Sequence, residues 1–170
     1  MDPDGTSLLF RAIPAPHKFP SEDKRALKAF AQTLQEHVAR GRAFTCLVTN
    51  DKELRKLNQT FLGHDYATDV LSFPSAGKSD RLLTRAVQQG MENIGELAIS
   101  AERAATQAEK FGHSRLDEVR VLMLHGVLHL TGLDHERDRG KMGRAERKWR
   151  TEFQLPDTLI ARSAKPESKR

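Results

Sequence analysis

The chain has very little cysteine and very few large aromatic residues. Its 170 residues include one cysteine, one tryptophan and one tyrosine. A lone cysteine, Cys46, excludes a disulfide framework, a cysteine-based zinc finger and an internal redox pair. Its apolar neighbours, from Phe44 to Val48, favour a small buried side chain. The shortage of tryptophan and tyrosine argues against extensive stacking on nucleic-acid bases.

Long apolar segments are missing as well. No run approaches the ~20 residues that a membrane-spanning helix needs. The N-terminal segment begins with acidic side chains and has no apolar stretch long enough for a signal peptide. We therefore expect a cytoplasmic protein with no membrane partner and no small organic cofactor.

The composition is that of a globular protein, with 38% hydrophobic and 30% charged residues. The length favours one domain, which we place at residues 1–158, followed by a disordered basic tail at 159–170. Apolar periodicity predicts, in order, a strand, a helix, a strand, a helix, two strands and then helices. This order indicates an α/β (α+β) fold with a small mixed four-stranded sheet and about five helices.

The individual elements follow from periodicity and from capping residues. The expected strands cover residues 7–13, 43–49, 70–73 and 94–99, and the expected helices cover residues 21–40, 51–62, 101–110, 115–131 and 135–149. The predicted N-caps are Ser21, Asn50, Ser100 and Ser114. The helix at 115–131 is apolar almost all round, which predicts a buried central helix. We expect the charged helix at 135–149 to be exposed to solvent. The polar segment at 75–93 is longer than an ordinary connection, and loops of this length are usually functional, mobile or partly helical.

The buried helix carries an unusual set of histidines. His125 and His129 lie four residues apart, on one face of a helix. Gly132 is suited to end the helix and turn the chain, so that His135 can approach the first two rings. Three imidazoles around an open fourth position describe a catalytic zinc site. Unsatisfied, each buried ring would cost about 1–3 kcal/mol. We therefore predict one zinc ion per chain, in a cleft on this helix, although nickel, copper or iron would also accept imidazole ligands.

The same spacing occurs in metzincin proteases, whose pattern is H-E-x-x-H-x-x-G-x-x-H. In those enzymes the glutamate after the first histidine acts as the general base. Gly126 occupies that position here, so the base for peptide hydrolysis is absent. Phosphodiester cleavage relies more on the metal and on positioned cations, and it suits this site better.

Two sequence blocks together resemble the YbeY family of bacterial metal-dependent endoribonucleases. Residues 125–135 match that family's H-G-x-L-H-L-x-G-[YL]-D-H signature, and residues 68–74 match its T-D-V-L-S-F-P block. Weaker similarities lie at residues 53–58 and 94–100. The resemblance implies an α/β fold, a three-histidine zinc site and single-strand-specific endoribonuclease activity. It also implies a role in ribosomal RNA maturation, at the 3′ end of 16S rRNA, and in ribosome quality control, with the small ribosomal subunit as partner.

Two positions depart from the family pattern. An arginine usually follows the aromatic residue that Phe61 represents, and Leu62 stands there instead. Glu96 replaces an aspartate, which keeps the charge. The missing arginine favours an alternative, a non-catalytic ribosome-associated RNA-binding protein with structural zinc, unless Arg55, Lys56 or His64 substitutes. A metalloprotease is the remaining alternative.

Further site residues are predicted around the histidines. Asp134 either orients a ligating imidazole or stabilises the turn after Gly132. The candidates for a general base are Asp134, Glu136 and Asp69. Thr68, Asp69 and Ser72 are candidates for lining the cleft, and Thr68 and Ser72 are also candidates for binding RNA. The commoner use of residues such as Asp69 and Ser72 is to fasten strand ends by hydrogen bonds.

The net charge of +5 comes from one part of the chain. Residues 1–135 contain 17 basic and 17 acidic side chains, whereas residues 136–170 contain 11 basic and 6 acidic ones. A solvated basic helix is the simpler explanation for this surplus. A basic segment beside a histidine site also suits a phosphate backbone, which makes Arg137, Arg139 and Lys141 candidate RNA-binding residues.

Overall fold

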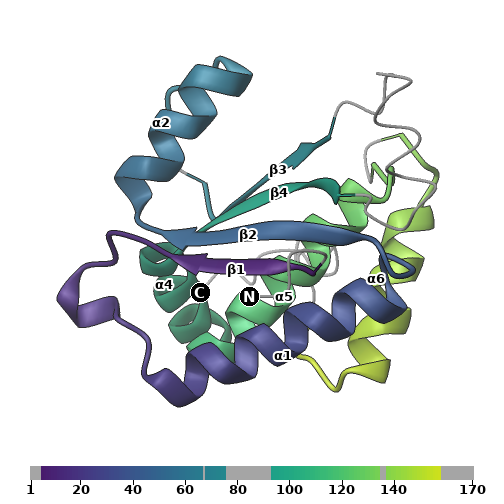
Figure 1. The fold of residues 1–170 in the computed structure, drawn as a ribbon, viewed down its shortest axis with the longest axis horizontal. Coiled ribbons are helices and arrows are strands. Elements are labelled where there is room, and N and C mark those ends of the chain that lie inside the picture. The colour runs from purple at the N-terminus through teal and green to yellow at the C-terminus, as the bar shows by residue number, and fades with distance from the viewer. Residues whose placement is uncertain (1–4, 67, 76–92, 135–136, 158–170) are drawn as a thin grey trace, which may run out of the picture.

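Four strands form one mixed sheet with helices on both faces (Figure 1). The computed structural model describes residues 5–66, 68–75, 93–134 and 137–157. The strands are β1 (Ser7–Phe10), β2 (Ala43–Thr49), β3 (Val70–Pro74) and β4 (Asn93–Ser100). Their order in the sheet is β1-β2-β4-β3, with β1, β2 and β4 parallel and β3 antiparallel to β4. The predicted mixed four-stranded sheet is confirmed.

The helices divide between the two faces of this sheet. They are α1 (Ser21–His37), α2 (Asp51–Leu62), α4 (Ala101–Phe111), α5 (Arg115–Leu130) and α6 (Lys141–Glu152), with a short 3-10 helix at Ala15–His17. Helices α1, α4, α5 and α6 lie on one side of the sheet, and α2 stands on the other (Figure 1). The predicted α/β class is therefore confirmed. No helix in the described ranges is both long enough and apolar enough to cross a bilayer.

Local sequence explains most of the helix starts. The side chains of Asn50, Ser100 and Ser114 each accept a hydrogen bond from the backbone N–H three residues further on, as predicted. The prediction for Ser21 is wrong. Pro20 occupies the N-cap position in extended conformation, and Ser21 is already the first helical residue.

Several element ends differ from the sequence-based prediction. Strand β1 ends at Phe10 instead of residue 13, and Ala12 beyond it has a φ of 53°, which extended strand geometry does not allow. Helix α1 ends at His37 instead of residue 40, because Arg40 and Gly41 take φ values of 55° and 87°. Most of the segment predicted as a loop at 75–93, and the tail predicted at 159–170, lie outside the described residues.

The core has a large part under α1, α4 and α5 and a small part under α2. Strand β4 alternates between them, with Leu97 and Ile99 in the large part and Ala98 in the small one. Helix α5 runs through the large part, and all of its residues from Val121 to Leu128 are buried. Cys46 is also buried there, and burial raises the pKa of its thiol to about 12. The predictions of a central buried helix and a buried cysteine are confirmed.

Candidate active site

Two histidine rings of α5 face each other. His125 and His129 lie one helical turn apart, and their ring centroids are 4.7 Å from each other. The Nε2 atom of His125 lies 3.1 Å from the Nε2 atom of His129. His125 is buried and His129 is half-buried. The structure thus brings together the two imidazoles that the spacing places on one helix face.

The opposite nitrogen of each ring is held by a group that accepts a hydrogen bond. The Nδ1 atom of His125 lies 3.1 Å from Oε1 of Glu146, and the Nδ1 atom of His129 lies 3.0 Å from the carbonyl oxygen of Leu133. A carbonyl or carboxylate oxygen can only accept, so both Nδ1 atoms carry the proton. In a neutral ring, Nε2 then carries the lone pair. Both lone pairs are therefore directed into the same small space.

Glu146 is the residue of this site that the sequence did not reveal. It lies on α6, and its side chain is completely buried. The prediction of a solvated helix at 135–149 is wrong in two respects. Helix α6 begins only at Lys141, after Gly140 in the left-handed conformation, and it buries Met142, Gly143 and Glu146 against the body of the protein. One signal was available, because Met142 and Glu146 lie four residues apart, at the spacing of a buried helix face.

The donor set fits a zinc ion. Zinc binds imidazole nitrogen at about 2.0–2.1 Å in tetrahedral geometry, which separates two such nitrogens by roughly 3.3 Å. The observed 3.1 Å between the Nε2 atoms is close to that edge. A carboxylate or carbonyl on the remote nitrogen is the usual partner of a metal-bound histidine. Within the described ranges no third histidine, cysteine or carboxylate completes a ligand cluster. His135, the third predicted ligand, and Glu136 lie outside the described residues.

Close packing explains the glycine between the histidines. A Cβ atom placed on Gly126 would lie 2.6 Å from Cδ2 of Leu97 on β4. Position 126 therefore faces the sheet and has no space for a side chain. A glutamate there would collide with the sheet and would point away from the imidazole pair. The geometry thus supports the argument against a metzincin-type base.

The turn after α5 has the predicted form. Gly132 has a φ of 101°, a left-handed conformation that favours glycine. The backbone N–H of Leu133 then bonds to the carbonyl of Leu128, while the carbonyl of Leu133 accepts from His129. Asp134 follows at the end of the described segment and is half-buried. Its role as base or as a partner of an imidazole stays a prediction.

The predicted residues of β3 take part in local hydrogen bonds. Oδ1 of Asp69 accepts from the backbone N–H of Val70 at 3.0 Å and from the hydroxyl of Thr68 at 3.3 Å. The hydroxyl of Ser72 donates to the carbonyl of Gly126 at 3.4 Å, so it links β3 to the histidine helix. These contacts favour a fastening role for Asp69 and Ser72. They also place Ser72 beside the residue that follows His125.

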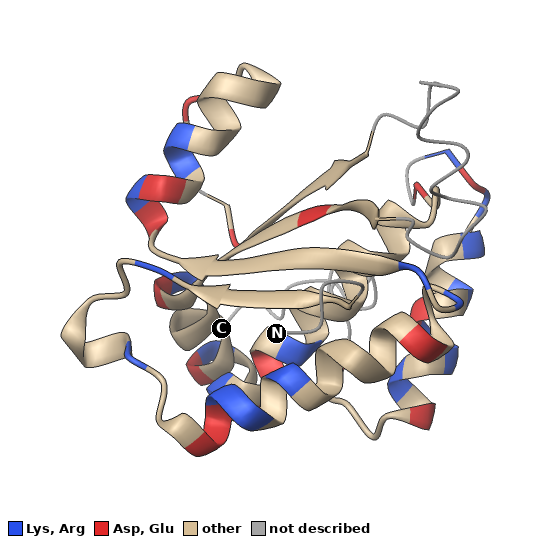
Figure 2. Ribbon diagram, viewed as in Figure 1, with Lys and Arg blue, Asp and Glu red and all other residues tan. Residues whose placement is uncertain are grey.

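The basic residues predicted to bind RNA lie in the turn that leads to α6 and at the first residue of that helix. Arg137, Arg139 and Lys141 are all exposed, and Arg139 has a φ of 56°. Figure 2 shows further basic positions along α6 itself. Binding of RNA by these three residues stays a prediction.

The end of α2 lacks the arginine that is usual in the family pattern. The three residues that were predicted as its possible substitutes differ in their contacts. Leu62 and Phe61 are exposed there. Arg55 is bound by Asp65 through two hydrogen bonds, of 2.8 and 3.2 Å, which raise the pKa of the guanidinium and lower that of the carboxyl. The His64 ring lies against Tyr66, and Lys56 is exposed. Arg55 is thus engaged elsewhere, which leaves Lys56 as the more available cation.

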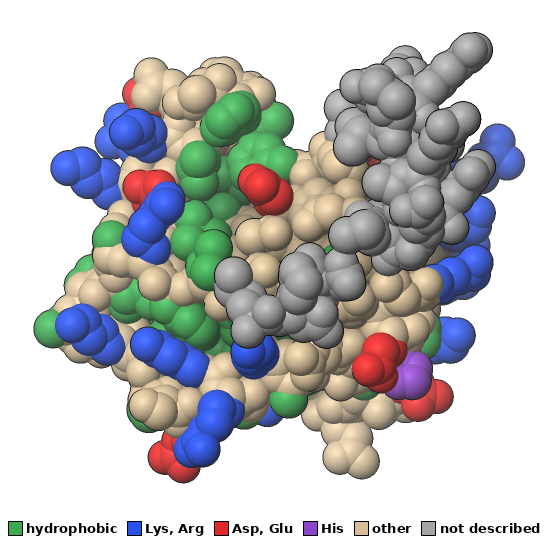
Figure 3. Space-filling view, in the orientation of Figure 1, with side chains coloured by type: hydrophobic (Ala, Val, Ile, Leu, Met, Phe, Trp, Pro, Cys, Tyr) green, Lys and Arg blue, Asp and Glu red, His purple; other side chains and the backbone are tan. Residues whose placement is uncertain are grey.

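An apolar groove lies beside α2 on the outer face of the sheet. Its lining includes Leu47, Leu57, Phe61 and Phe73, and Figure 3 shows hydrophobic side chains gathered on this face. The histidine helix covers the opposite face of the sheet (Figure 1). The groove is therefore separate from the imidazole pair.

The fold and the histidine pair define an α/β protein with its candidate active site on a central buried helix. A family model described as endoribonuclease YbeY matches residues 16–154. A Solibacter usitatus protein named endoribonuclease YbeY is 48% identical over 160 residues, which are 94% of this chain and 96% of that protein. A Helicobacter pylori protein of the same name is 39% identical over 117 residues, 69% of this chain and 76% of its own.

A solved structure with low sequence identity shares the fold. The solution structure of a Thermotoga maritima protein matches with a TM-score of 0.53 and 22% identity, over 97% of this chain and the whole of that one. The family model and the relatives together decide the family, and the chain belongs to the endoribonuclease YbeY family. The resemblance drawn from residues 125–135 and 68–74 is confirmed.

Proposed function

We propose that the protein is a zinc-dependent, single-strand-specific endoribonuclease that matures ribosomal RNA. The Nε2 atoms of His125 and His129 lie 3.1 Å apart, and the Nδ1 atom of each ring faces an acceptor oxygen; this geometry carries the proposal. When each Nδ1 holds the proton of its ring, the two Nε2 atoms present lone pairs to each other. Two such lone pairs repel each other unless a cation lies between them. Membership of the family supplies the substrate class, RNA.

The proposed site combines three ligands with a carboxylate behind the first. His125, His129 and His135 would hold one zinc ion, which would supply Lewis acidity for water activation and for neutralising phosphate charge. Glu146 and the carbonyl of Leu133 fix the rotation and the protonation of the two described rings. Because these partners come from α6 and from the turn after α5, the ring positions are set before any ligand arrives.

The biological assignment extends the family's activity to this chain. We infer processing of the 3′ end of 16S rRNA and ribosome quality control, in the cytoplasm, with the small ribosomal subunit as partner. Its general base is to be sought among Asp134, Glu136 and Asp69. Of these, Asp69 has its Oδ1 atom engaged in local bonds.

A direct experiment measures metal and cleavage together. The zinc content of the purified protein is determined, and the protein is incubated with a ribosomal RNA precursor, with and without a chelator, beside His129→Ala. We expect about one zinc per chain, cleavage in unpaired regions, and loss of both zinc and cleavage in the variant. Intact RNA under every metal condition would overturn the proposal.

The missing arginine at Leu62 favours a second candidate, a zinc-bearing RNA-binding protein without catalysis. Such a protein would bind one zinc and bind RNA with a steep salt dependence, yet leave the RNA uncut. Replacement Leu62→Arg separates the two candidates. A large gain in cleavage from a near-zero level would support the second one, whereas a modest change on an active protein would support the first.

A further inference from the structure

A cavity of about 400 Å³ lies between the end of α1, the turn into β2 and the helices α5 and α6. Four basic side chains line it, His37, Arg40, Arg42 and Lys148. No lining residue is acidic, and none of the four forms an ion pair with a carboxylate in the described part of the chain. We call it the cationic pocket. Its unneutralised positive charge suits an anionic ligand.

The cationic pocket shares its walls with the imidazole pair. Leu128 and Leu133 line the pocket, while the neighbouring His129 and the carbonyl of Leu133 form part of the histidine site. Ala145 lines the pocket on α6, and the next residue is Glu146. Neighbouring residues of α5 and α6 therefore form the wall between the cationic pocket and the histidine site.

An aromatic side chain lies within the same cavity. Trp149 is half-buried, and its ring stacks on Phe153 with the centroids 5.4 Å apart. The Nζ atom of Lys148 lies 4.7 Å from the centroid of the Trp149 ring. Basic positions also gather along α6 and at the turn before β2 in Figure 2. Cations beside an aromatic ring in an open groove are what single-stranded nucleic acids bind.

We propose that the cationic pocket binds the phosphate backbone of single-stranded RNA next to the bond that is cut. Arg40, Arg42 and Lys148 contact the phosphates, and Trp149 lies against the strand. This inference rests on the proposed function, and it places substrate binding on the turn between α1 and β2 and on α6, as well as on the predicted residues Arg137, Arg139 and Lys141.

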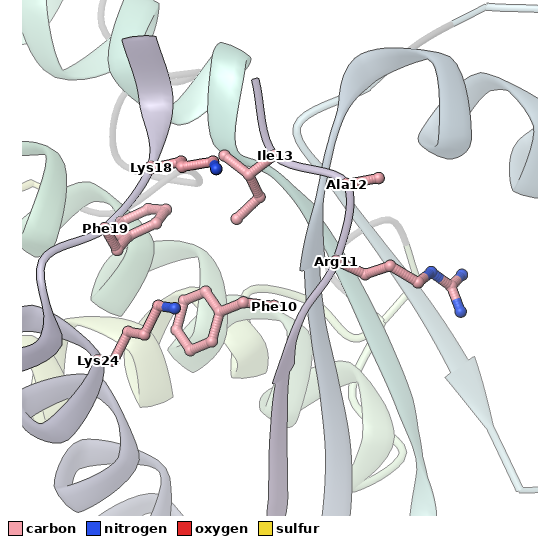
Figure 4. A pocket seen from close by; sticks show the side chains of 7 residues that line it. All are labelled: Phe10, Arg11, Ala12, Ile13, Lys18, Phe19 and Lys24. Atoms are coloured by element: carbon pink, nitrogen blue, oxygen red, sulfur yellow. The ribbon is translucent and has the colours of Figure 1, made fainter. Parts of the chain in front are cut away.

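A second basic cavity offers a matched control. It has about 310 Å³ and lies between the end of β1 and the start of α1 (Figure 4). Lys24 there lies over the ring of Phe10, at 5.1 Å, and Arg11 pairs with Glu53 on α2. No residue that lines this cavity belongs to α5 or α6. Its charge therefore resembles that of the cationic pocket, whereas its position does not.

The test compares two variants that lose three charges each. One is Arg40→Gln/Arg42→Gln/Lys148→Gln, and the control is Lys18→Gln/Lys24→Gln/Arg25→Gln, in exposed positions around the second cavity. Binding of a labelled, phosphorothioate-linked single-stranded RNA to the full-length protein is measured by anisotropy over a range of salt concentrations. In the pocket variant we expect affinity to fall about tenfold or more and the salt slope to become shallower by about 2. The control stays within about twofold of the original protein.

Trp149 reports on the same pocket directly, because it is the only tryptophan in the chain. RNA should change its fluorescence in the original protein and in the control variant. Lys148→Gln alone, at an exposed position, repeats the test with little risk to folding. Unchanged Trp149 fluorescence at saturating RNA, or equal loss of binding in pocket and control variants, would overturn the proposal. So would saturation of the signal by AMP at concentrations where RNA has no effect, since the pocket would then be a mononucleotide site.

Failure of the proposed function gives a different result. If the original protein cuts no RNA but binds it, and only the pocket variant loses binding, the cationic pocket is supported and the nuclease proposal is not. If cleavage is intact in the original protein and the pocket variant binds and cuts equally well, the nuclease proposal stands and the pocket is refuted.

Discussion

Helix α5 begins beside one histidine–glutamate pair with little exposure and contributes the histidine of a second such pair near its end. In the first pair, Nε2 of His113 contacts Oε2 of Glu118, and in the second, Nδ1 of His125 contacts Oε1 of Glu146. The histidine side chains are 11% and 10% exposed, and both glutamates are fully buried. Burial and a carboxylate partner are therefore the same in both.

The difference lies on the other side of the ring. The Nε2 atom of His125 faces a second imidazole, that of His129, whereas no described histidine contacts His113. The first pair joins residues five apart and fastens the turn between α4 and α5. The second joins residues twenty-one apart, on two helices. What makes a buried histidine a site residue is thus what its second nitrogen faces.

Removing the histidine ring from each pair should give the largest difference between the pairs in zinc content and RNA cleavage. His125→Ala removes a proposed ligand, so we expect loss of bound zinc and a fall in RNA cleavage of about 10³-fold. His113→Ala should keep both zinc content and cleavage, because its ring faces no second imidazole. Metal analysis and an RNA cleavage assay on both variants decide this. Equal loss in the two would remove the distinction between the pairs.

Changing the carboxylate should give a smaller contrast. Glu146→Gln keeps the shape of the side chain but removes the charge behind His125, and partners of metal ligands typically contribute about 10–100-fold in metal affinity. Competition for zinc with a fluorescent chelator measures this without any activity assay. Glu118→Gln is the matched control and should leave zinc affinity unchanged. Recovery of affinity in Glu146→Asp would show that charge, and not volume, matters.

Adding one methyl group at Gly126, next to His125, tests how closely α5 packs against the sheet beside the second pair. In Gly126→Ala the new Cβ would lie 2.6 Å from Leu97 Cδ2, so α5 must shift from the sheet or Leu97 must move. Overpacking of this kind costs about 1–3 kcal/mol of unfolding free energy. Urea denaturation measures it, and Leu97→Val in the same chain should restore part of the loss. A fully additive double variant would contradict the contact.

The smallest effect is expected at the first pair. Glu118→Gln replaces a charged hydrogen bond to His113 by a neutral one, which should lower the unfolding free energy by about 1 kcal/mol. Thermal unfolding detects this change, and cleavage of RNA should not respond. A loss of cleavage without a loss of stability would mean that the start of α5 belongs to the site.

The sequence predicted what depends on neighbouring residues. The order of strands and helices along the chain, three of four predicted helix caps and the shared face of His125 and His129 follow from patterns within single elements. Glu146 did not, because its burial depends on which face of α6 meets α5, a long-range contact between charged and apolar segments. Ser21 failed for a local reason, since Pro20 already supplies the extended residue before the helix.

The buried thiol of Cys46 allows the opening of the core to be measured. The thiol is fully buried in β2 and its pKa is raised to about 12, so almost no thiolate forms and no reagent reaches it while the sheet is closed. Its rate of alkylation therefore reports how often the core opens. Any ligand that binds only the closed protein slows alkylation in proportion to its occupancy. Zinc and RNA affinity can thus be read from a single natural atom, without a label.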